Sequence, residues 1–152
     1  MHSRILILDF GSQYTQLIAR CIRSLQVYCE IHPYNWSAKQ ISDFHPQAVI
    51  LSGSPYSVSQ AGAPHPDDLI WQLGVPILGI CYGMQLVIDH YEGKVNPAEK
   101  REYGFAELRI RDFGDIFRGL GHSEAVWMSH GDSISLLPEE FEIGRASCRE
   151  RV

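Results

Sequence analysis

Short apolar runs alternate with amphipathic segments from the start of the chain to Gly93. The runs are rich in Val, Ile and Leu, and nearly continuous apolar runs are typical of strands buried on both faces of a parallel sheet. Between them, apolar residues recur at helical spacing, with Ser12 as the predicted N-cap of the first helix. Strands are predicted at 4–9, 27–31, 48–53 and 75–80, and helices at about 12–25, 38–44, 69–73 and 84–91. This rhythm predicts an α/β fold, an open and mostly parallel sheet with helices on both faces.

The pattern changes in the last third of the chain, where apolar and polar residues alternate over short stretches. Strands are predicted at 103–111, 125–130 and 133–138, and they indicate a small antiparallel extension. Gly131 stands between the last two and indicates a tight turn from His130 to Asp132. The alternative is that His130 and Asp132 form a base and the group that orients it. The strand spacing of Trp127 and Met128 predicts that at least one of them packs in the core.

The composition of the chain is that of a globular domain and argues against several classes of partner. The 152 residues are 45% hydrophobic and 20% charged, which is ordinary for one globular domain. The net charge of -5 argues against nucleic acid or an anionic membrane surface as a partner, because both attract basic patches. No apolar run approaches the roughly 20 residues of a spanning helix, and a strand-like segment begins too early for a cleavable signal. We therefore expect a cytoplasmic protein with no nucleic acid and no membrane as partner.

The chain has four cysteines, at Cys21, Cys29, Cys81 and Cys148. They form no C-x-x-C pair, so neither a disulfide framework nor a zinc site is predicted, and no metal is expected. Cys21 in the first helix and Cys29 in the second strand are interpreted as core residues. Asp9, at the end of the first strand, is expected to cap or bond within its own loop.

The stretch GICYGMQ, residues 79–85, follows the fourth predicted strand. It fits G-x-nucleophile-x-G, the strand-to-helix elbow in which glycines relieve crowding around a strained, exposed nucleophile. The positive end of the following helix favours the thiolate of Cys81, which is the form that attacks. The N–H of Tyr82 would point toward the oxyanion formed when a thiolate adds to a carbonyl, and Gly53 in LSGSP would supply a second donor. The alternative interpretation of Cys81 is a small core-filling residue.

Five stretches carry a resemblance to a known family, namely ILILDFGSQYTQLIAR, ILSGSP, GICYGMQ, REYGFAEL and VWMSHGD. In this order and spacing they resemble class I, triad-type glutamine amidotransferases, and most closely the amidotransferase domain of GMP synthases. The resemblance runs from about Arg4 to Phe141 and implies a flavodoxin-like α/β fold. It also implies that Cys81 attacks the side-chain amide of glutamine, forms a γ-glutamyl thioester and releases ammonia.

The resemblance assigns roles around Cys81 as well. The backbone N–H groups of Gly53 and Tyr82 would stabilise the oxyanion. The residues that would bind glutamine are Gly83, Gln85, Ser129 and His130. Where the family reads S-G-G-P the chain has Ser54. A positive φ at that position would cost a serine about 1 kcal/mol relative to glycine.

By the same resemblance, the ammonia passes to a C-terminal ATP-pyrophosphatase domain, or to a separately encoded subunit, that adenylates XMP and aminates it to GMP. ATP and Mg are expected cofactors of that partner, and no cofactor is expected in this domain. The parent protein is expected to be a homodimer. One alternative is an amidotransferase subunit of anthranilate, carbamoyl phosphate or CTP synthesis. The other is a non-catalytic flavodoxin-like domain that binds a partner or senses oxidation through Cys81.

The histidine and the carboxylate of the family's triad are not found in the sequence. In the family they lie in an HPE motif downstream of SHGD, whereas the His-Pro pairs at His32, His45 and His65 all precede Cys81. Only the pair at His65 is followed by an acid, Asp67, and His65 is interpreted as a surface residue. A thiol without a positioned base attacks poorly, so this chain is expected to show at most trace glutaminase activity.

The last eleven residues, EIGRASCRERV at 142–152, read differently from the rest. They resemble the frame-wise translation of a common sequencing adapter, and residues 143–152 hold three arginines and one glutamate. We therefore expect a partial type 1 amidotransferase domain at 1–141 followed by a non-native tail at 142–152. Cys148 would then be an artefact rather than a redox site.

Overall fold

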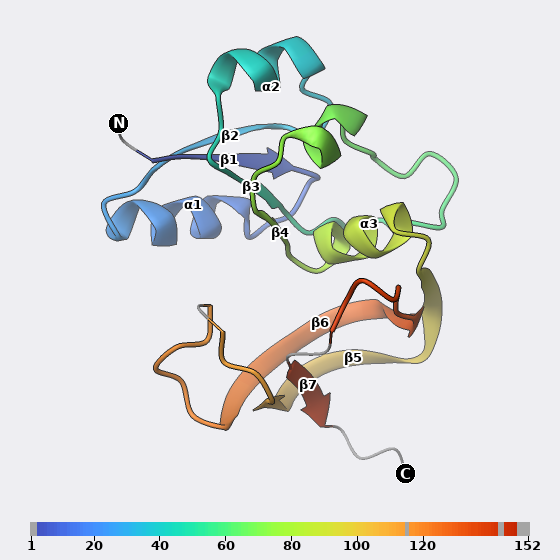
Figure 1. The fold of residues 1–152 in the computed structure, drawn as a ribbon. Helices are drawn as coiled ribbons and strands as arrows, with labels where there is room; N and C mark the ends of the chain where they lie inside the picture. The colour runs from blue at the N-terminus through green and yellow to red at the C-terminus, as the bar shows by residue number, and fades with distance from the viewer. Residues whose placement is uncertain (1–2, 115, 143–144, 149–152) are drawn as a thin grey trace.

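The computed structural model describes residues 3–114, 116–142 and 145–148 of the chain. The larger of two sheets is parallel, with strand order β2-β1-β3-β4 (Figure 1). Its strands are β1 (Arg4–Asp9), β2 (Tyr28–Pro33), β3 (Ala48–Leu51) and β4 (Ile77–Gly79). The helical elements are α1 (Thr15–Ser24), α2 (Ala38–Phe44), the 3-10 helix η1 (Asp68–Gln72) and α3 (Tyr82–His90). The predicted α/β architecture is confirmed. Within the described ranges, no helix has the length and apolar character needed to cross a membrane.

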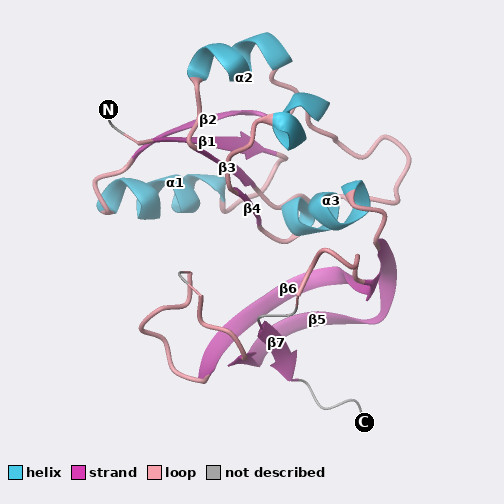
Figure 2. Cartoon of the chain, in the orientation of Figure 1, coloured by secondary structure: helices cyan, strands magenta, loops and turns pink. Residues whose placement is uncertain are grey.

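Alternation of side chains along β1 divides the core into two layers. On one face of the sheet, Leu6 packs in a cluster with Ile41 of α2 and Leu86 of α3. On the other face, Ile7 packs with Ala19 of α1. Helices thus lie on both sides of the parallel sheet (Figure 2). Two covered faces explain why the strands read as continuous apolar runs.

The two N-terminal helix boundaries show how local polar residues set helix starts. α2 begins at its predicted residue because Ser37 and Gln40 form a reciprocal capping box. Ser12 was predicted as the N-cap of the first helix, and this is wrong, because the N-cap is Tyr14. The Ser12 hydroxyl accepts a hydrogen bond from the N–H of Tyr14 at 3.1 Å, which forms a turn, and α1 starts at Thr15.

The smaller sheet is antiparallel, with strand order β6-β5-β7. Its strands are β5 (Lys94–Ile110), β6 (Ser123–Leu136) and β7 (Arg145–Cys148). The predicted antiparallel extension is present, but the predicted turn from His130 to Asp132 is wrong. The long β5 pairs with β6 on both sides of Gly131, across a register shift, and this keeps the chain extended there. β7 falls within residues 142–152, and the interpretation of that segment as a non-native tail stays a prediction.

Of the two cysteines predicted to lie in the core, one is buried and the other is exposed. Cys29 is 2% exposed in the core, as predicted, and its thiol donates a hydrogen bond to the Ala19 carbonyl oxygen at 3.6 Å. Cys21 is exposed, so its assignment to the core is wrong. The buried positions of α1 are Thr15 and Ala19, and Cys21 lies off that stripe.

Candidate active site

Cys81 lies at the junction between β4, which ends at Gly79, and α3, which begins at Tyr82. The structure therefore places it where the elbow pattern predicts. Its backbone has φ 54° and ψ -110°. A positive φ is uncommon for any residue except glycine, and this ψ also lies outside the left-handed helical region. Strain of this kind costs about 1–3 kcal/mol and concentrates at functional sites, where packing holds it in place.

Two glycines allow the strained residue to sit there. A Cβ on Gly83 would lie 2.2 Å from the carbonyl oxygen of Leu51, and a Cβ on Gly79 would lie 2.5 Å from the backbone nitrogen of Met84. Both distances are far inside van der Waals contact. The first turn of α3 thus packs directly against the strand backbones, and only glycine permits this approach.

Gly53, just after β3, is the neighbour of Cys81 across the carboxyl end of the sheet. A Cβ on Gly53 would lie 3.5 Å from Cβ of Cys81 and 3.5 Å from Oγ of Ser12. Glycine therefore leaves open the space beside the thiol. The N–H of Gly83 donates to the carbonyl oxygen of Ser52 at 3.1 Å, which ties the elbow to the end of β3. The segment after β3 is thus close enough to Cys81 for its N–H groups to serve a reacting carbonyl.

Ser54 does not carry the strain that a positive φ would impose. The described non-glycine residues with positive φ are Gln26, His45, Cys81 and Glu92. The cost expected for serine at position 54 therefore does not arise in this conformation. No backbone or side-chain acceptor among the described residues takes a hydrogen bond from the N–H of Gly53 or of Ser54. The roles of the Gly53 and Tyr82 N–H groups as oxyanion donors stay predictions.

The environment of the Cys81 thiol disfavours its charged form. Burial is the largest cause and raises the pKa of Cys81 above its usual value. A hydrogen bond from the backbone N–H of Tyr82 lowers this pKa, and the negative charge of Asp132 raises it further. The net direction is upward, opposite to the expectation from the helix N-terminus. Attack by Cys81 therefore needs a group that removes the thiol proton.

The Tyr82 side chain anchors the first turn of α3 through one hydrogen bond and one aromatic contact. It is fully buried, and its hydroxyl donates a hydrogen bond to the Pro64 carbonyl oxygen at 2.8 Å. Its ring packs against Phe10, with ring centroids 5.7 Å apart. Burial raises the pKa of Tyr82 to about 12, with the charge of Asp89 as a smaller cause. The phenol thus stays neutral and links the first turn of α3 to the loop after Gly53.

Gln85 holds a buried acceptor on the same helix. It lies four residues after Cys81 and is 5% exposed. Its Oε1 has no hydrogen-bond partner among the described residues. Buried polar atoms are rarely left unpaired, so an unpaired acceptor near a reactive residue points to a donor that arrives with a ligand. The roles of Gln85 and Gly83 in binding glutamine stay predictions.

Strand β6 carries the remaining predicted residues. Ser129 and His130 pair with Tyr103 and Glu102 of β5, and their side chains lie outside the described part of the chain. Their predicted contact with substrate stays a prediction. Asp132, two residues further along β6, was not predicted as a site residue, yet its charge acts on Cys81. The signal was present, since Asp132 ends the VWMSHGD stretch.

The other candidate residues are engaged elsewhere. Asp9 bonds within its own loop as predicted, since its carboxylate accepts from the N–H of Gly11 at 3.0 Å and the hydroxyl of Thr15 at 2.8 Å. The His32 ring stacks on Trp36 at 3.6 Å between centroids. His65 is exposed, as predicted.

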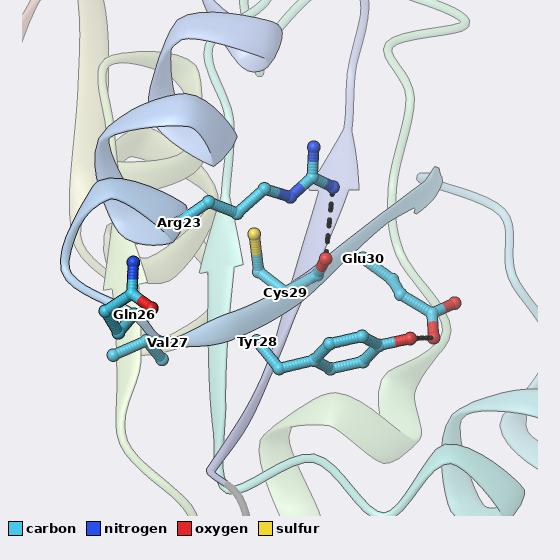
Figure 3. A pocket seen from close by; sticks show the side chains of 6 residues that line it. All are labelled: Arg23, Gln26, Val27, Tyr28, Cys29 and Glu30. Atoms are coloured by element: carbon cyan, nitrogen blue, oxygen red, sulfur yellow. Dashed lines mark hydrogen bonds between the residues drawn. The ribbon is translucent and has the colours of Figure 1, made fainter.

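A surface hollow of about 490 Å³ lies at the start of β2, beside the end of α1 (Figure 3). There the Arg23 guanidinium donates to the Cys29 carbonyl oxygen at 3.1 Å, and the Tyr28 hydroxyl donates to Glu30. These polar groups satisfy one another. The hollow lies at the amino end of β2, whereas ligands of parallel sheets bind at the carboxyl ends. It is therefore a weaker candidate than the Cys81 region.

Comparison with known proteins gives a consistent family. A family model described as "Glutamine amidotransferase class-I" matches residues 6–151. A GMP synthase (glutamine-hydrolyzing) of Brachyspira hyodysenteriae is 56% identical over 140 residues, which are 92% of this chain and 27% of that protein. The corresponding protein of Thiobacillus denitrificans is 51% identical over 151 residues, covering 94% of this chain and 29% of its own length. The chain thus spans less than a third of these relatives.

Solved structures agree with the family match. A protein from Thermoplasma acidophilum, described as one subunit of a GMP synthase, superposes with a TM-score of 0.81 at 26% identity, covering 97% of this chain and 74% of that one. A glutamine amidotransferase from Thermotoga maritima superposes with a TM-score of 0.65 at 16% identity, covering 90% of this chain and 64% of that one. The second likeness, at this low identity, concerns the fold alone.

Proposed function

Because the chain belongs to the class-I glutamine amidotransferase family, we propose that Cys81 is the nucleophile that removes ammonia from the side-chain amide of glutamine. The single observation that carries this proposal is the backbone of Cys81, at φ 54° and ψ -110° between a strand and a helix. A core-filling cysteine has no reason to occupy a strained conformation, whereas a nucleophile at a strand-to-helix elbow does.

The chemistry follows from the groups around Cys81. The thiolate adds to the amide carbon, the C–S bond forms, and the carbonyl electron pair moves to oxygen. The N–H groups of Tyr82 and Gly53 stabilise that oxyanion. The intermediate collapses to a thioester as the C–N bond breaks, and the nitrogen leaves as ammonia once protonated. Water then cleaves the thioester, so glutamine and water give glutamate and ammonia.

Both proton transfers need a positioned base that later acts as an acid. The family resemblance places that histidine in an HPE motif, which the sequence of this chain does not contain. The raised pKa of the Cys81 thiol makes the requirement stricter, because less thiolate forms unaided. We therefore expect at most trace turnover from this chain.

The proposed role of the parent protein is to supply ammonia for the amination of XMP to GMP. Relatives at about half identity carry the name GMP synthase (glutamine-hydrolyzing), and this supports the choice over anthranilate, carbamoyl phosphate or CTP synthesis. The proposed partner is an ATP-pyrophosphatase domain or subunit that uses ATP and Mg. Cytoplasmic location and a homodimeric parent are proposed on the resemblance.

The test compares the 152-residue chain with a chimera. In the chimera, residues 1–141 continue into the segment that follows in the Brachyspira hyodysenteriae relative, where the family resemblance places the HPE motif. We expect the chimera to release glutamate from glutamine at least about 100-fold faster than the chain alone, the typical contribution of a positioned proton-transfer group. Replacement of Cys81 by Ala in the chimera should abolish release. Equal turnover by the two folded proteins, or activity that survives Cys81→Ala, would show that the assignment is wrong.

A further inference from the structure

Ser52, between β3 and Gly53, forms hydrogen bonds through its N–H, its carbonyl oxygen and its hydroxyl. Its side chain is completely buried. Its N–H donates to the Leu8 carbonyl oxygen at 3.1 Å, and its carbonyl oxygen accepts from the N–H of Gly83 at 3.1 Å. Its hydroxyl accepts from the N–H of Phe10 at 3.0 Å and donates to the carbonyl oxygen of Gly53 at 3.0 Å. One small side chain thus joins the end of β1 to the peptide beside Cys81.

The bond to Gly53 acts on the peptide unit that links Gly53 to Ser54. In a trans peptide the C=O and the N–H point in opposite directions, so a hydroxyl that holds the Gly53 carbonyl also fixes the direction of the Ser54 N–H. Rotation of this unit would exchange the two groups. A carbonyl oxygen would then face the position where the oxyanion forms, and two negative oxygens would repel each other.

Glycine at position 53 makes such a rotation easy. A Cβ on Gly53 would lie 3.5 Å from Cβ of Cys81, which is an ordinary van der Waals contact, and it would occupy the space beside the thiol. A glycine adopts positive and negative φ about equally well, so the position that must be open is also the one with the least intrinsic order. Some other group has to hold the peptide.

We propose that Ser52 is a positioning residue for the amidotransferase reaction. Its buried hydroxyl holds the Gly53 carbonyl oxygen away from the position where the oxyanion forms beside Cys81, and this leaves that position to the N–H groups of Gly53 and Tyr82. This inference rests on the proposed function of Cys81. It adds a residue that touches no substrate atom and acts through Gly53. The hydroxyl completes the oxyanion site by excluding the rotated peptide.

Two thiol reagents separate this role from a general effect on folding. A chloroketone analogue of glutamine alkylates Cys81 as sulfur displaces chloride, and negative charge builds on the ketone oxygen as it does on the amide oxygen of glutamine. Iodoacetamide also alkylates the thiolate as iodide leaves, but its small size and simple displacement make no use of an oxyanion site. The ratio of the two rates at Cys81, read by peptide mass spectrometry on the full chain, therefore reports the oxyanion site.

The variants are Ser52→Ala, Ser52→Thr and Ser52→Val. We expect Ser52→Ala to lower the chloroketone rate by about 10-fold, less than the roughly 100-fold loss that follows complete removal of an oxyanion donor. The iodoacetamide rate, which follows thiolate content and access, should change by less than about twofold. Thr and Val have the same β-branched shape and differ by a hydroxyl in place of a methyl group, so Thr should retain a high ratio and Val should not. If circular dichroism shows that Ser52→Ala is unfolded, the comparison of the Thr and Val variants still tests the proposal.

Ser57→Ala is the matched control, because the Ser57 hydroxyl bonds Ser59 in the same loop and lies outside the contacts described for Gly53. It should leave both rates unchanged. Equal chloroketone rates for the wild-type chain and Ser52→Ala, or for the Thr and Val variants, would overturn the role of Ser52. Parallel loss of both rates would overturn it too, since that outcome indicates a change in the thiol or the fold. A wild-type chain whose Cys81 reacts with the chloroketone no more selectively than Cys21 would instead overturn the proposed function, and the inference with it.

Discussion

The parallel and antiparallel sheets differ in how far neighbouring elements cover their side chains. In the parallel sheet, Leu6 and Ile7 on adjacent positions of β1 are both fully buried, each on its own face. In the antiparallel sheet, Leu108 of β5 is 8% exposed on one face. On the other face, Phe105 and Trp127 lie opposite each other across the strands and are 61% and 81% exposed. One sheet is therefore packed on two sides and the other on one.

The difference explains where the reactive residue lies. A residue held at φ 54° and ψ -110° stores strain that the surrounding structure must balance. Cys81 meets this condition because Gly79 and Gly83 bring α3 into contact with the backbones of the two-sided sheet. The antiparallel sheet supplies charge, through Asp132, but the strained geometry belongs to the parallel one.

The largest expected effect on the free energy of unfolding comes from replacing a buried leucine by alanine in each of the two sheets. Leu6→Ala in the parallel sheet should lower the free energy of unfolding by about 4 kcal/mol, because a fully buried leucine leaves a cavity that its neighbours cannot fill. Leu108→Ala in the antiparallel sheet should cost about 2 kcal/mol, since one open face lets the site relax. Urea unfolding followed by circular dichroism measures both. Equal costs for the two variants would remove the basis of the comparison.

The second effect concerns the contact between helix and sheet at the elbow. Gly83→Ala places a Cβ where the Leu51 carbonyl oxygen lies 2.2 Å away, so the helix has to shift. We expect a loss of about 3 kcal/mol in the free energy of unfolding, at the upper end of the usual cost of overpacking. Gly62→Ala is the control for adding a methyl group, because nothing lies within 4 Å of its Cβ position. Its φ of 78° adds backbone strain for alanine, so the cost of Gly83→Ala is compared with the cost of this variant. A Gly83→Ala variant as stable as wild type would contradict the close packing of α3 on β3.

Much of the parallel sheet could be predicted from the sequence, for a physical reason. Strand β1 was predicted to its exact bounds, because a strand buried on both faces reads as an apolar run that ends where polar residues begin. In β6, by contrast, Gly131 suggested a turn. Pairing with the long β5 keeps that glycine extended, and such pairing is a long-range contact that local spacing does not reveal.

In the candidate site too, features that depend on local sequence could be predicted, and features that depend on long-range contacts could not. The position of Cys81 follows from its two flanking glycines, which are local in sequence. The stretch VWMSHGD includes Asp132, but the effect of its charge on the thiol could not be predicted, because it depends on how near the fold brings Asp132 to Cys81. Ser52 was missed because a small polar residue at the end of an apolar run reads only as the end of a strand. Its hydrogen bonds become visible only when β1 and α3 are placed beside it.

An intermediate effect is expected at Tyr82, which joins the elbow to the following loop. Tyr82→Phe should cost about 1–2 kcal/mol at pH 7, because the Pro64 carbonyl oxygen loses its buried donor. The folded phenol has a pKa of about 12, against 10.0 for an unperturbed tyrosine, so the folded state binds more protons between these values. Wild-type stability should therefore fall as pH rises through that window, by at most about 1.4 kcal/mol per pH unit from this group.

The difference between the wild-type chain and the Tyr82→Phe variant isolates that group, since the remaining tyrosines titrate in both proteins. Urea unfolding at several pH values should show the difference shrinking above pH 10.0, the unperturbed tyrosine value. A difference that grows with pH would mean that the Tyr82 phenolate is favoured by folding. The buried contact with Pro64 would then be wrong.

The smallest effect is expected on the exposed face of the antiparallel sheet. Trp127→Thr keeps a residue suited to a strand and removes a ring that is 81% exposed, so stability should change by less than about 0.5 kcal/mol. The same measurement at two protein concentrations is the control, because a ring covered by a second copy of the chain would make stability rise with concentration. A large loss at both concentrations would place Trp127 inside a packed layer of its own chain. Both faces of the antiparallel sheet would then be covered, and the contrast between a two-sided and a one-sided sheet would no longer explain why the strained cysteine lies where it does.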